Sequence, residues 1–274
     1  MHPHTCRSFC FLAPLAPAAV LIGALMAAMS AQAAPTTTRY VAPAGTDSGD
    51  CSSSGAPCRT IAYAAGQAAA GDTISIAAGI YYENVTSAKG LTFVGAGADG
   101  TFVDGGGNGR VFAIDDSSVV LTDLAVQHGS AASGAGINAN VNASLTLTRV
   151  TVADNTATSG NGGGIAAAGP MLNIAESTIF SNTASGSGGG IAASATLTAT
   201  IYNTTFYANS STLYGGALFN YDASPQLSNV SFSANQSDAG GAVANLSDAA
   251  GITPRFANAI LWGDSANAGG EIFN

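Results

Sequence analysis

Residues 206–218, Phe-Tyr-Ala-Asn-Ser-Ser-Thr-Leu-Tyr-Gly-Gly-Ala-Leu, contain both halves of the motif that decides the fold. The first half is an apolar residue three positions before an asparagine, and the second is a glycine-rich run that ends in an apolar residue. The first half recurs at 152–155, 179–182 and 232–235, and the second at 162–165, 188–191 and 240–243. The first half recurs every 26 or 27 residues and the second every 25 to 27, and internal similarity of this kind is typical of a repeat protein.

Two further columns of apolar residues keep nearly the same period. The first contains Leu121, Leu147, Ile174, Ile201, Leu227 and Phe256, and the second contains Ile137, Ile165, Ile191, Leu218, Val243 and Ile272. A chain that returns to the same apolar positions every 25 to 29 residues, with short alternating runs such as 145–147, coils with three strands in each turn. Helical repeats and leucine-rich horseshoes are excluded because the unit contains no helical pattern. The sequence therefore predicts an all-β protein with a parallel β-helix over residues 73–274.

The recurring asparagine predicts a structural ladder inside this β-helix. Its members are Asn155, Asn182, Asn209 and Asn235, with Asp264 and Gly129 at the equivalent positions of the end coils. Asparagine at a strand bend tolerates the left-handed backbone region, and stacked side-chain amides can hydrogen-bond to one another. A glycan-binding or metal-binding role for this column is the weaker interpretation. A second polar row, which includes Asp123, Arg149 and Glu176, is predicted to form ion pairs on the surface.

The first residues have the pattern of an export signal. Arg7 is followed by an apolar run over 11–29 and by Ala31-Gln-Ala33, which has the small-residue form that signal peptidase accepts. We therefore predict a signal peptide over residues 1–34 and a secreted, periplasmic or outer-surface location. No later stretch is apolar enough to span a bilayer, so we expect no transmembrane segment after signal cleavage.

The four cysteines indicate one disulfide. Cys6 and Cys10 would leave with the signal peptide, and Cys51 and Cys58 would remain as a pair in an oxidising compartment. Two cysteines with no histidine nearby are too few for a zinc site. We therefore expect a local disulfide, no metal and no cofactor.

Residues 35–72 are predicted to form an N-terminal segment that contains the disulfide loop and a short helix. The helix is expected over the alanine-rich run 60–70, which Gly71 ends. It would cover the first coil, because an open β-solenoid exposes unpaired strand edges and apolar columns. At the other end the sequence stops in the middle of a coil, so we expect an incomplete C-terminal end: a fragment, a missing downstream region or an end covered by another chain.

Composition limits the classes of partner. The 274 residues are 47% hydrophobic and 8% charged with a net charge of −9, which favours a folded, weakly acidic protein. Seven residues are Lys or Arg, and one of them lies in the predicted signal peptide. A nucleic-acid partner is excluded, since that affinity depends on clustered cations.

The motifs also carry a resemblance to known families. The pairs 206–209 with 215–218 and 232–235 with 240–243 resemble the repeats of polymorphic outer-membrane proteins. The segments 40–47, 57–61, 71–74, 78–81 and 103–107 resemble the opening of exported bacterial pectin-lyase-like β-helix proteins. This resemblance covers residues 39–274 and implies right-handed coils. It implies little about activity, because that superfamily mixes lyases, hydrolases and adhesins.

Four residues are the candidates for catalysis: Asp104, Arg110, Asp115 and Asp116. A glycoside hydrolase needs two carboxyl groups that face each other at about 5–9.5 Å, whereas neighbours such as Asp115 and Asp116 point to opposite faces of a strand. A polysaccharide lyase needs a base, for which Arg110, Arg149 and Arg255 are possible, but the spacing pairs no acidic cluster with any of them. His128 is the only histidine after the signal segment, and a surface histidine is its simpler interpretation.

Four tyrosines form a candidate aromatic platform for a glycan: Tyr202, Tyr207, Tyr214 and Tyr221. The leading hypothesis is a secreted or surface-exposed adhesion or glycan-binding module without a catalytic site, whose partner is a polysaccharide or a cell-surface glycan. The alternatives are a polysaccharide lyase or glycoside hydrolase, and a structural stalk of a longer surface protein. Retention of the protein on polysaccharides without cleavage would distinguish a binding module from an enzyme and from a stalk.

Overall fold

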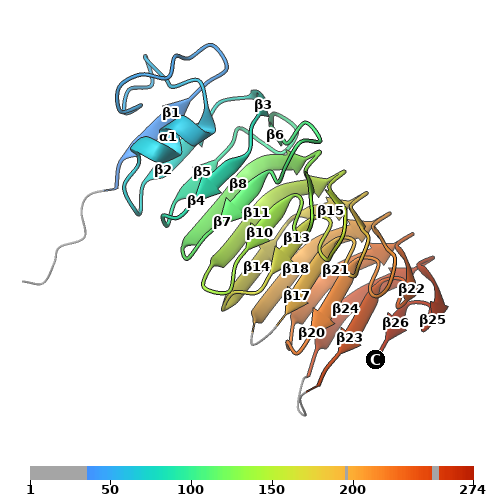
Figure 1. Ribbon diagram of the computed structural model, residues 1–274. Helices are drawn as coiled ribbons and strands as arrows, with labels where there is room; N and C mark the ends of the chain where they lie inside the picture. The colour runs from blue at the N-terminus through green and yellow to red at the C-terminus, as the bar shows by residue number, and fades with distance from the viewer. Residues whose placement is uncertain (1–35, 195–196, 249–252) are drawn as a thin grey trace, which may run out of the picture. The chain divides into compact units, whose positions relative to one another are not determined.

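The computed structural model describes residues 36–194, 197–248 and 253–274, so the predicted signal peptide lies outside the described residues. Three sheets and one short helix, α1 (Ile61–Gln67), form this part of the chain. Figure 1 shows successive coils stacked side by side from α1 to the C-terminus. The strand pairs that join one coil to the next are parallel, which confirms the predicted all-β parallel β-helix.

Three sheets, called A, B and C, run along the β-helix, and each coil from Ser118 onward contributes to all three. Sheet A contains β1 (Thr38–Val41), β2 (Thr73–Ile76), β3 (Gly79–Tyr82), β5 (Thr92–Val94), β6 (Thr101–Asp104), β8 (Ser118–Gln127), β11 (Ser144–Ala153), β14 (Met171–Ala175), β15 (Thr178–Phe180), β18 (Thr198–Tyr207), β21 (Gln226–Ser233) and β24 (Arg255–Trp262). Sheet B contains β4 (Val85–Ser87), β7 (Phe112–Ile114), β10 (Ile137–Ala139), β13 (Ile165–Ala167), β17 (Ile191–Ser194), β20 (Leu218–Tyr221), β23 (Val243–Leu246) and β26 (Ile272–Phe273). Sheet C contains β9 (Ser130–Ala131), β12 (Thr156–Ala157), β16 (Thr183–Ala184), β19 (Ser210–Ser211), β22 (Gln236–Ala239) and β25 (Ser265–Ala268).

The apolar columns lie inside the coils. The register places Leu147 beside Leu121 in sheet A and Ile165 beside Ile137 in sheet B, and all four side chains are buried. Parallel strands about 4.8 Å apart bring equivalent side chains into contact, so a sequence period becomes a stacked core. The equivalent side chains of the last coil are only partly buried: Phe256, Leu261 and Ile272.

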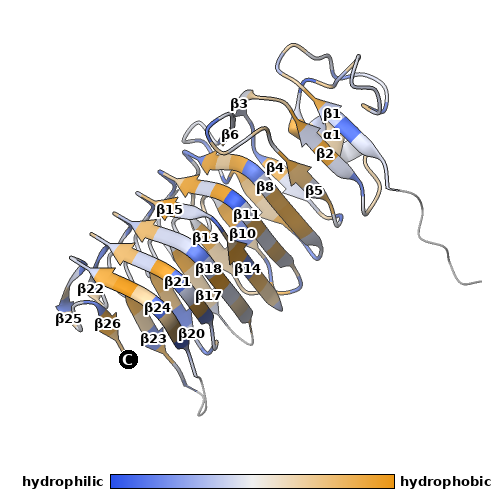
Figure 2. Ribbon diagram, turned by 180° about the vertical axis from the view of Figure 1, so that it is seen from behind, coloured by the Kyte–Doolittle hydropathy of each residue, from blue (hydrophilic) through white to orange (hydrophobic). Residues whose placement is uncertain are grey.

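The second polar row lies on the outside of sheet A, at the bend in the middle of each long strand or, for Glu176, in the break between β14 and β15. Its members all have positive φ between 50° and 56°: Asp123, Arg149, Glu176, Asn203, Asn229 and Asn258. Figure 2 shows a hydrophilic band across these strands between hydrophobic segments. The Arg149 guanidinium bonds to Asp123 at 2.6 Å and lies 3.8 Å from Glu176, so the charged members form a surface ion-pair row.

The asparagine column forms a buried hydrogen-bonded ladder at the turn from sheet A to sheet C. Asn155 donates its backbone N–H and its side-chain amide to Asn182 Oδ1, at 3.2 and 2.9 Å. The same two bonds link Asn182 to Asn209 and Asn209 to Asn235. Asp264 Oδ1 accepts the same two bonds from Asn235. Because a carboxylate has no amide N–H to donate, the ladder ends at Asp264.

The glycine-rich motif makes the next turn, from sheet C to sheet B. Gly162 has φ +69°, a region that favours glycine. A Cβ atom on Gly163 would lie 2.4 Å from the carbonyl oxygen of Thr183 in the next coil. The motif therefore allows adjacent coils to approach more closely than a side chain would permit.

The helix α1 covers the first coil, and its seven residues confirm the short helix predicted over 60–70. The Thr60 side chain accepts a hydrogen bond from Tyr63 N–H, and the Glu83 carboxylate accepts from Ile61 and Ala62 N–H, both at 2.9 Å. These bonds satisfy donors that have no partner within the helix.

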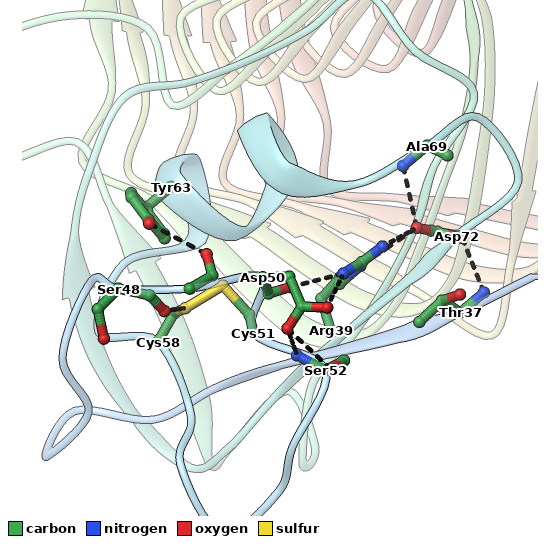
Figure 3. Close-up of polar contacts among 11 residues, drawn as sticks. Thr37, Arg39, Ser48, Asp50, Cys51, Ser52, Cys58, Tyr63, Ala69 and Asp72 are labelled. Carbon is green, nitrogen blue, oxygen red and sulfur yellow. Dashed lines mark hydrogen bonds and ion pairs between the residues drawn. A yellow bond between two sulfur atoms is a disulfide. The ribbon is translucent and has the colours of Figure 1, made fainter.

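Helix α1 ends at Gln67, before the predicted end at residue 70, because two side chains bind the backbone there. Lys89 donates to the carbonyls of Ala65, Gly66 and Ala68. Ala68 is already extended, and the Asp72 carboxylate accepts Ala69 N–H. The nearby loop contains the Cys51–Cys58 disulfide, which confirms that prediction (Figure 3).

Candidate functional site

Sheet B carries a groove of about 310 Å³ on its outer face. Alternate residues of a strand point to opposite faces, so the residue after each inward-facing apolar residue of sheet B points outward. The register aligns these outward residues in one row: Ala113, Asn138, Ala166, Ala192, Phe219, Ala244 and Phe273. Ala166 and Ala192 form the floor, and the groove exists because two successive coils have only a methyl group at this position.

The walls of the groove are uncharged. Asn161 lies on the wall formed by the turn from sheet C, and Asn140 and Ser194 lie on the wall formed by the turn toward sheet A. Among the described residues, the Asn138 side chain has no hydrogen-bond partner. Its amide is therefore available to donate to and accept from a ligand in the groove.

An aromatic cluster closes the groove at one end. Phe219 follows Ala192 in the outward row, and the Tyr214 and Tyr221 rings lie on either side of it, with centroids 6.1 and 6.4 Å from the Phe219 ring. The Tyr214 ring also lies near the Phe273 ring, with centroids 6.1 Å apart. The site therefore combines an apolar floor, amide side chains and aromatic rings, the combination expected of a site for an uncharged polar ligand.

The four predicted platform tyrosines lie in two places. Tyr214 and Tyr221 flank Phe219, whereas Tyr202 and Tyr207 lie on β18 in sheet A. Tyr207 stacks on Phe180 of the preceding coil, with ring centroids 4.6 Å apart. Phe219 was not among the predicted site residues, although its sequence position, one residue after the buried column, marks it as an outward-facing aromatic side chain.

The predicted catalytic residues have separate structural contacts. Arg110 donates to the Gly134 and Ser133 carbonyls, both at 2.9 Å. Asp116 Oδ1 accepts from the amides of Asn140 and Asn142, at 3.1 and 3.0 Å, so it supports one wall of the groove. Asp115 precedes it in the turn after β7.

Asp104 is buried and lies at the end of β6, on the outside of sheet A. One oxygen accepts from the Gln127 amide at 2.9 Å and contacts His128 Nδ1 at 2.8 Å, and the other accepts Gly106 N–H at 2.8 Å. Burial alone would raise the pKa of Asp104, but these hydrogen bonds outweigh it and hold the pKa below its usual value. The carboxylate therefore orders the junction between β6 and β8.

The Asp104→Asn variant should be less stable than the wild type at neutral pH, by about 1–3 kcal/mol, because the new amide group faces donors. A lowered pKa means that the carboxylate stabilises the fold above about pH 4 and that this contribution is lost as the pH falls further. Thermal unfolding from pH 3 to pH 8 should show that the difference in stability between the wild type and Asp104→Asn becomes smaller at low pH. The exposed Asp99→Asn is the control, and an equal gap at pH 3 and pH 7 would contradict the assignment.

Among the residues that the structure describes, no helix is long and apolar enough to cross a membrane. In the same ranges, no three His, Cys, Asp or Glu side chains gather in an arrangement that could hold a metal ion.

Comparison with known proteins identifies the family. Residues 78–258 match the family model described as right handed beta helix region. No curated protein matches the chain. Two solved structures of similar shape are a pectin methylesterase mutant in complex with a hexasaccharide, with 12% identity and a TM-score of 0.47, and the pectin methylesterase PemA from Erwinia chrysanthemi, with 13% identity and a TM-score of 0.45. Each match covers 79% of this chain and 68% of the other. The family match spans more than half of the chain, so this protein belongs to the right-handed β-helix family.

Proposed function

We propose that this protein is an exported carbohydrate-binding β-helix that holds a neutral glycan in the groove on sheet B. The observation that carries the proposal is the groove itself, an alanine floor between amide-bearing walls that ends on Phe219. A sugar ring has apolar C–H faces and a polar edge, so it can pack on methyl groups and aromatic rings while amides bond to its hydroxyls.

The size and charge of the groove narrow the class of ligand. Its length spans β10, β13 and β17, about 10 Å at the spacing of parallel strands, and its volume of about 310 Å³ is at the lower end for a small-molecule site. That space fits about two or three sugar rings. The uncharged lining and the net charge of −9 both disfavour an acidic polysaccharide.

The enzymatic alternatives gain no support from the arrangement of the candidate catalytic residues. Both Asp104 oxygens are occupied by donors, and Arg110 is bound to backbone carbonyls. Hydrolysis of a glycoside requires two carboxyl groups on either side of one bond. Binding alone is therefore the function that we propose, and a stalk without ligands is the competing one.

The Ala166→Trp variant should weaken glycan retention about tenfold or more, because an indole would occupy the floor of the groove. Retention is measured by affinity electrophoresis on xylan and glucomannan as neutral probes and on polygalacturonate and alginate as acidic ones. The matched control is Ala257→Trp, which adds the same side chain at an exposed position of sheet A.

The outcomes separate the three functions. The proposal is supported if a neutral glycan retains the wild type and Ala257→Trp but does not retain Ala166→Trp. New reducing ends or unsaturated products in the same samples would favour an enzyme. Folded wild-type protein that all four probes fail to retain would contradict the proposal and favour a stalk.

A further inference from the structure

The outward row of sheet B changes abruptly in size at one coil. The groove follows three successive members of this row, Asn138, Ala166 and Ala192, and Phe219 occupies the next position. Because equivalent positions of parallel strands lie about 4.8 Å apart, the phenyl ring stands at the end of the alanine floor and rises above it. The groove lining ends at this ring.

The aromatic cluster covers the coil beyond Phe219 as well. Ala244, the next residue of the outward row, is 0% exposed although it points away from the core. It packs in a small cluster with Phe219 and Ala192, against which Tyr214, Tyr221 and Phe273 also pack. A bound chain therefore cannot continue along the sheet in this direction.

The cluster is held in place from both sides. The Tyr221 hydroxyl bonds to the Asp248 carboxylate, and Tyr214 pairs with Ala239 of the next coil through its backbone. Phe219 is itself 8% exposed, so its small free surface faces the groove that it lines. These contacts make the closed end a fixed wall.

The opposite end of the groove is open. There the outward row continues from Asn138, which carries the unbonded amide, to the small side chain of Ala113. Val141, which also lines the groove, is 68% exposed. A chain that enters here meets polar groups first and the aromatic wall last. The groove thus has a direction, with one entrance and one closed end.

We infer that the groove recognises the terminal sugars of a neutral glycan chain, with the end of the chain against Phe219 and the rest leaving over β10. This inference rests on the proposed function and adds the mode of recognition. A site closed at one end binds one chain end for each molecule of ligand, whereas an open groove would bind any internal stretch. Phe219 is then the residue that determines this specificity.

Affinity as a function of chain length tests the inference. Titration calorimetry with cello-, xylo- and manno-oligosaccharides of about two to six sugars gives the affinity per mole of chain, and about three sugars should fill the groove. For the wild type the affinity should rise up to that length and then stay constant. In Phe219→Ala the groove should extend toward Ala244, so the affinity should continue to rise for longer chains.

Two further variants protect this test against a folding failure. Tyr214→Ser and Tyr221→Ser open the flanks of the wall without removing the buried ring, and each should shift the plateau to longer chains. Tyr207→Ala removes an aromatic ring from sheet A and should leave the plateau unchanged.

The possible results distinguish the inference from the function on which it rests. If no oligosaccharide binds the wild type, the proposed function fails. If oligosaccharides bind but the wild-type affinity rises steadily to six sugars, the function stands and end recognition is overturned. An unchanged plateau in folded Phe219→Ala and in both tyrosine variants would also overturn it.

Discussion

Replacing Asn182 with leucine should lower the free energy of unfolding by about 3–5 kcal/mol, because the change interrupts the buried ladder in its middle. Asn182 is fully buried, and its oxygen accepts both bonds from Asn155. Its amide donates to the carbonyls of Val152 and Phe180 and to Asn209. Leucine has the same number and branching of side-chain heavy atoms, so the change leaves no cavity, and the loss reports mainly the hydrogen-bonding groups that remain unsatisfied.

Urea unfolding followed by circular dichroism measures this loss. The control is Asn173→Leu on β14, an outward position, where we expect a change within about 0.5 kcal/mol. Asn182→Asp should be at least as destabilising as Asn182→Leu at neutral pH, since one carboxylate oxygen still accepts from Asn155 but the other would be buried against the oxygens of Val152, Phe180 and Asn209. A loss below about 1 kcal/mol for Asn182→Leu would show that the ladder is not a structural requirement.

The regular coils were predictable because their period fixes the register. Once Asn155 and Asn182 occupy equivalent positions, the strands on either side align, and a slip of one residue would turn every apolar side chain outward. The buried columns and the ladder therefore follow from spacing alone. The short helix followed from local composition, but its end did not, because Lys89 and Asp72 reach it from outside the helix.

The groove was not predictable in the same way. It depends on the sizes of outward residues such as Ala166 and Ala192, and the apolar pattern of the core does not constrain these positions. Tyr207 and Tyr214 are near in sequence, but Tyr207 lies on β18 of sheet A, whereas Tyr214 lies after the turn at Asn209, between β19 and β20. Their common surface could not be judged before the corners of the coil were known.

Two sets of polar contacts were also missed, for different reasons. Asp104 and His128 are 24 residues apart, in the irregular first coils, and the pairing of β6 with β8 joins them. Inside sheet B the Asn220 amide donates to Asn245 at 3.4 Å, and the Asn245 amide donates to Asn274 at 2.7 Å. This second ladder has steps of 25 and 29 residues, the same as those of Leu218, Val243 and Ile272 two positions earlier, so the spacing could have revealed it.

The N-terminal segment depends on one buried carboxylate, Asp72, which is 2% exposed. It accepts Thr37 N–H at 2.7 Å, Ala69 N–H at 2.9 Å and two bonds from Arg39 at 3.2 Å (Figure 3). Burial alone would raise the pKa of Asp72, but the two backbone donors and Arg39 outweigh this and lower it. The carboxylate thus connects β1, the end of α1 and the start of β2.

The Asp72→Ala variant should lose about 3–5 kcal/mol at pH 7, because Arg39 would lose its buried partner and two N–H groups would lose their acceptor. The lowered pKa fixes the sign of the pH dependence: the stabilisation is present above about pH 4 and is lost as the pH falls, so the variant and the wild type should converge in acid. Urea unfolding at pH 3, 5 and 7 measures this. Asp50→Ala is the control, since Asp50 pairs with the same arginine on the solvent side and its loss should matter much less. A gap that stays constant from pH 7 to pH 3 would mean that the charge of Asp72 does not hold the segment, and that its removal acts through packing alone.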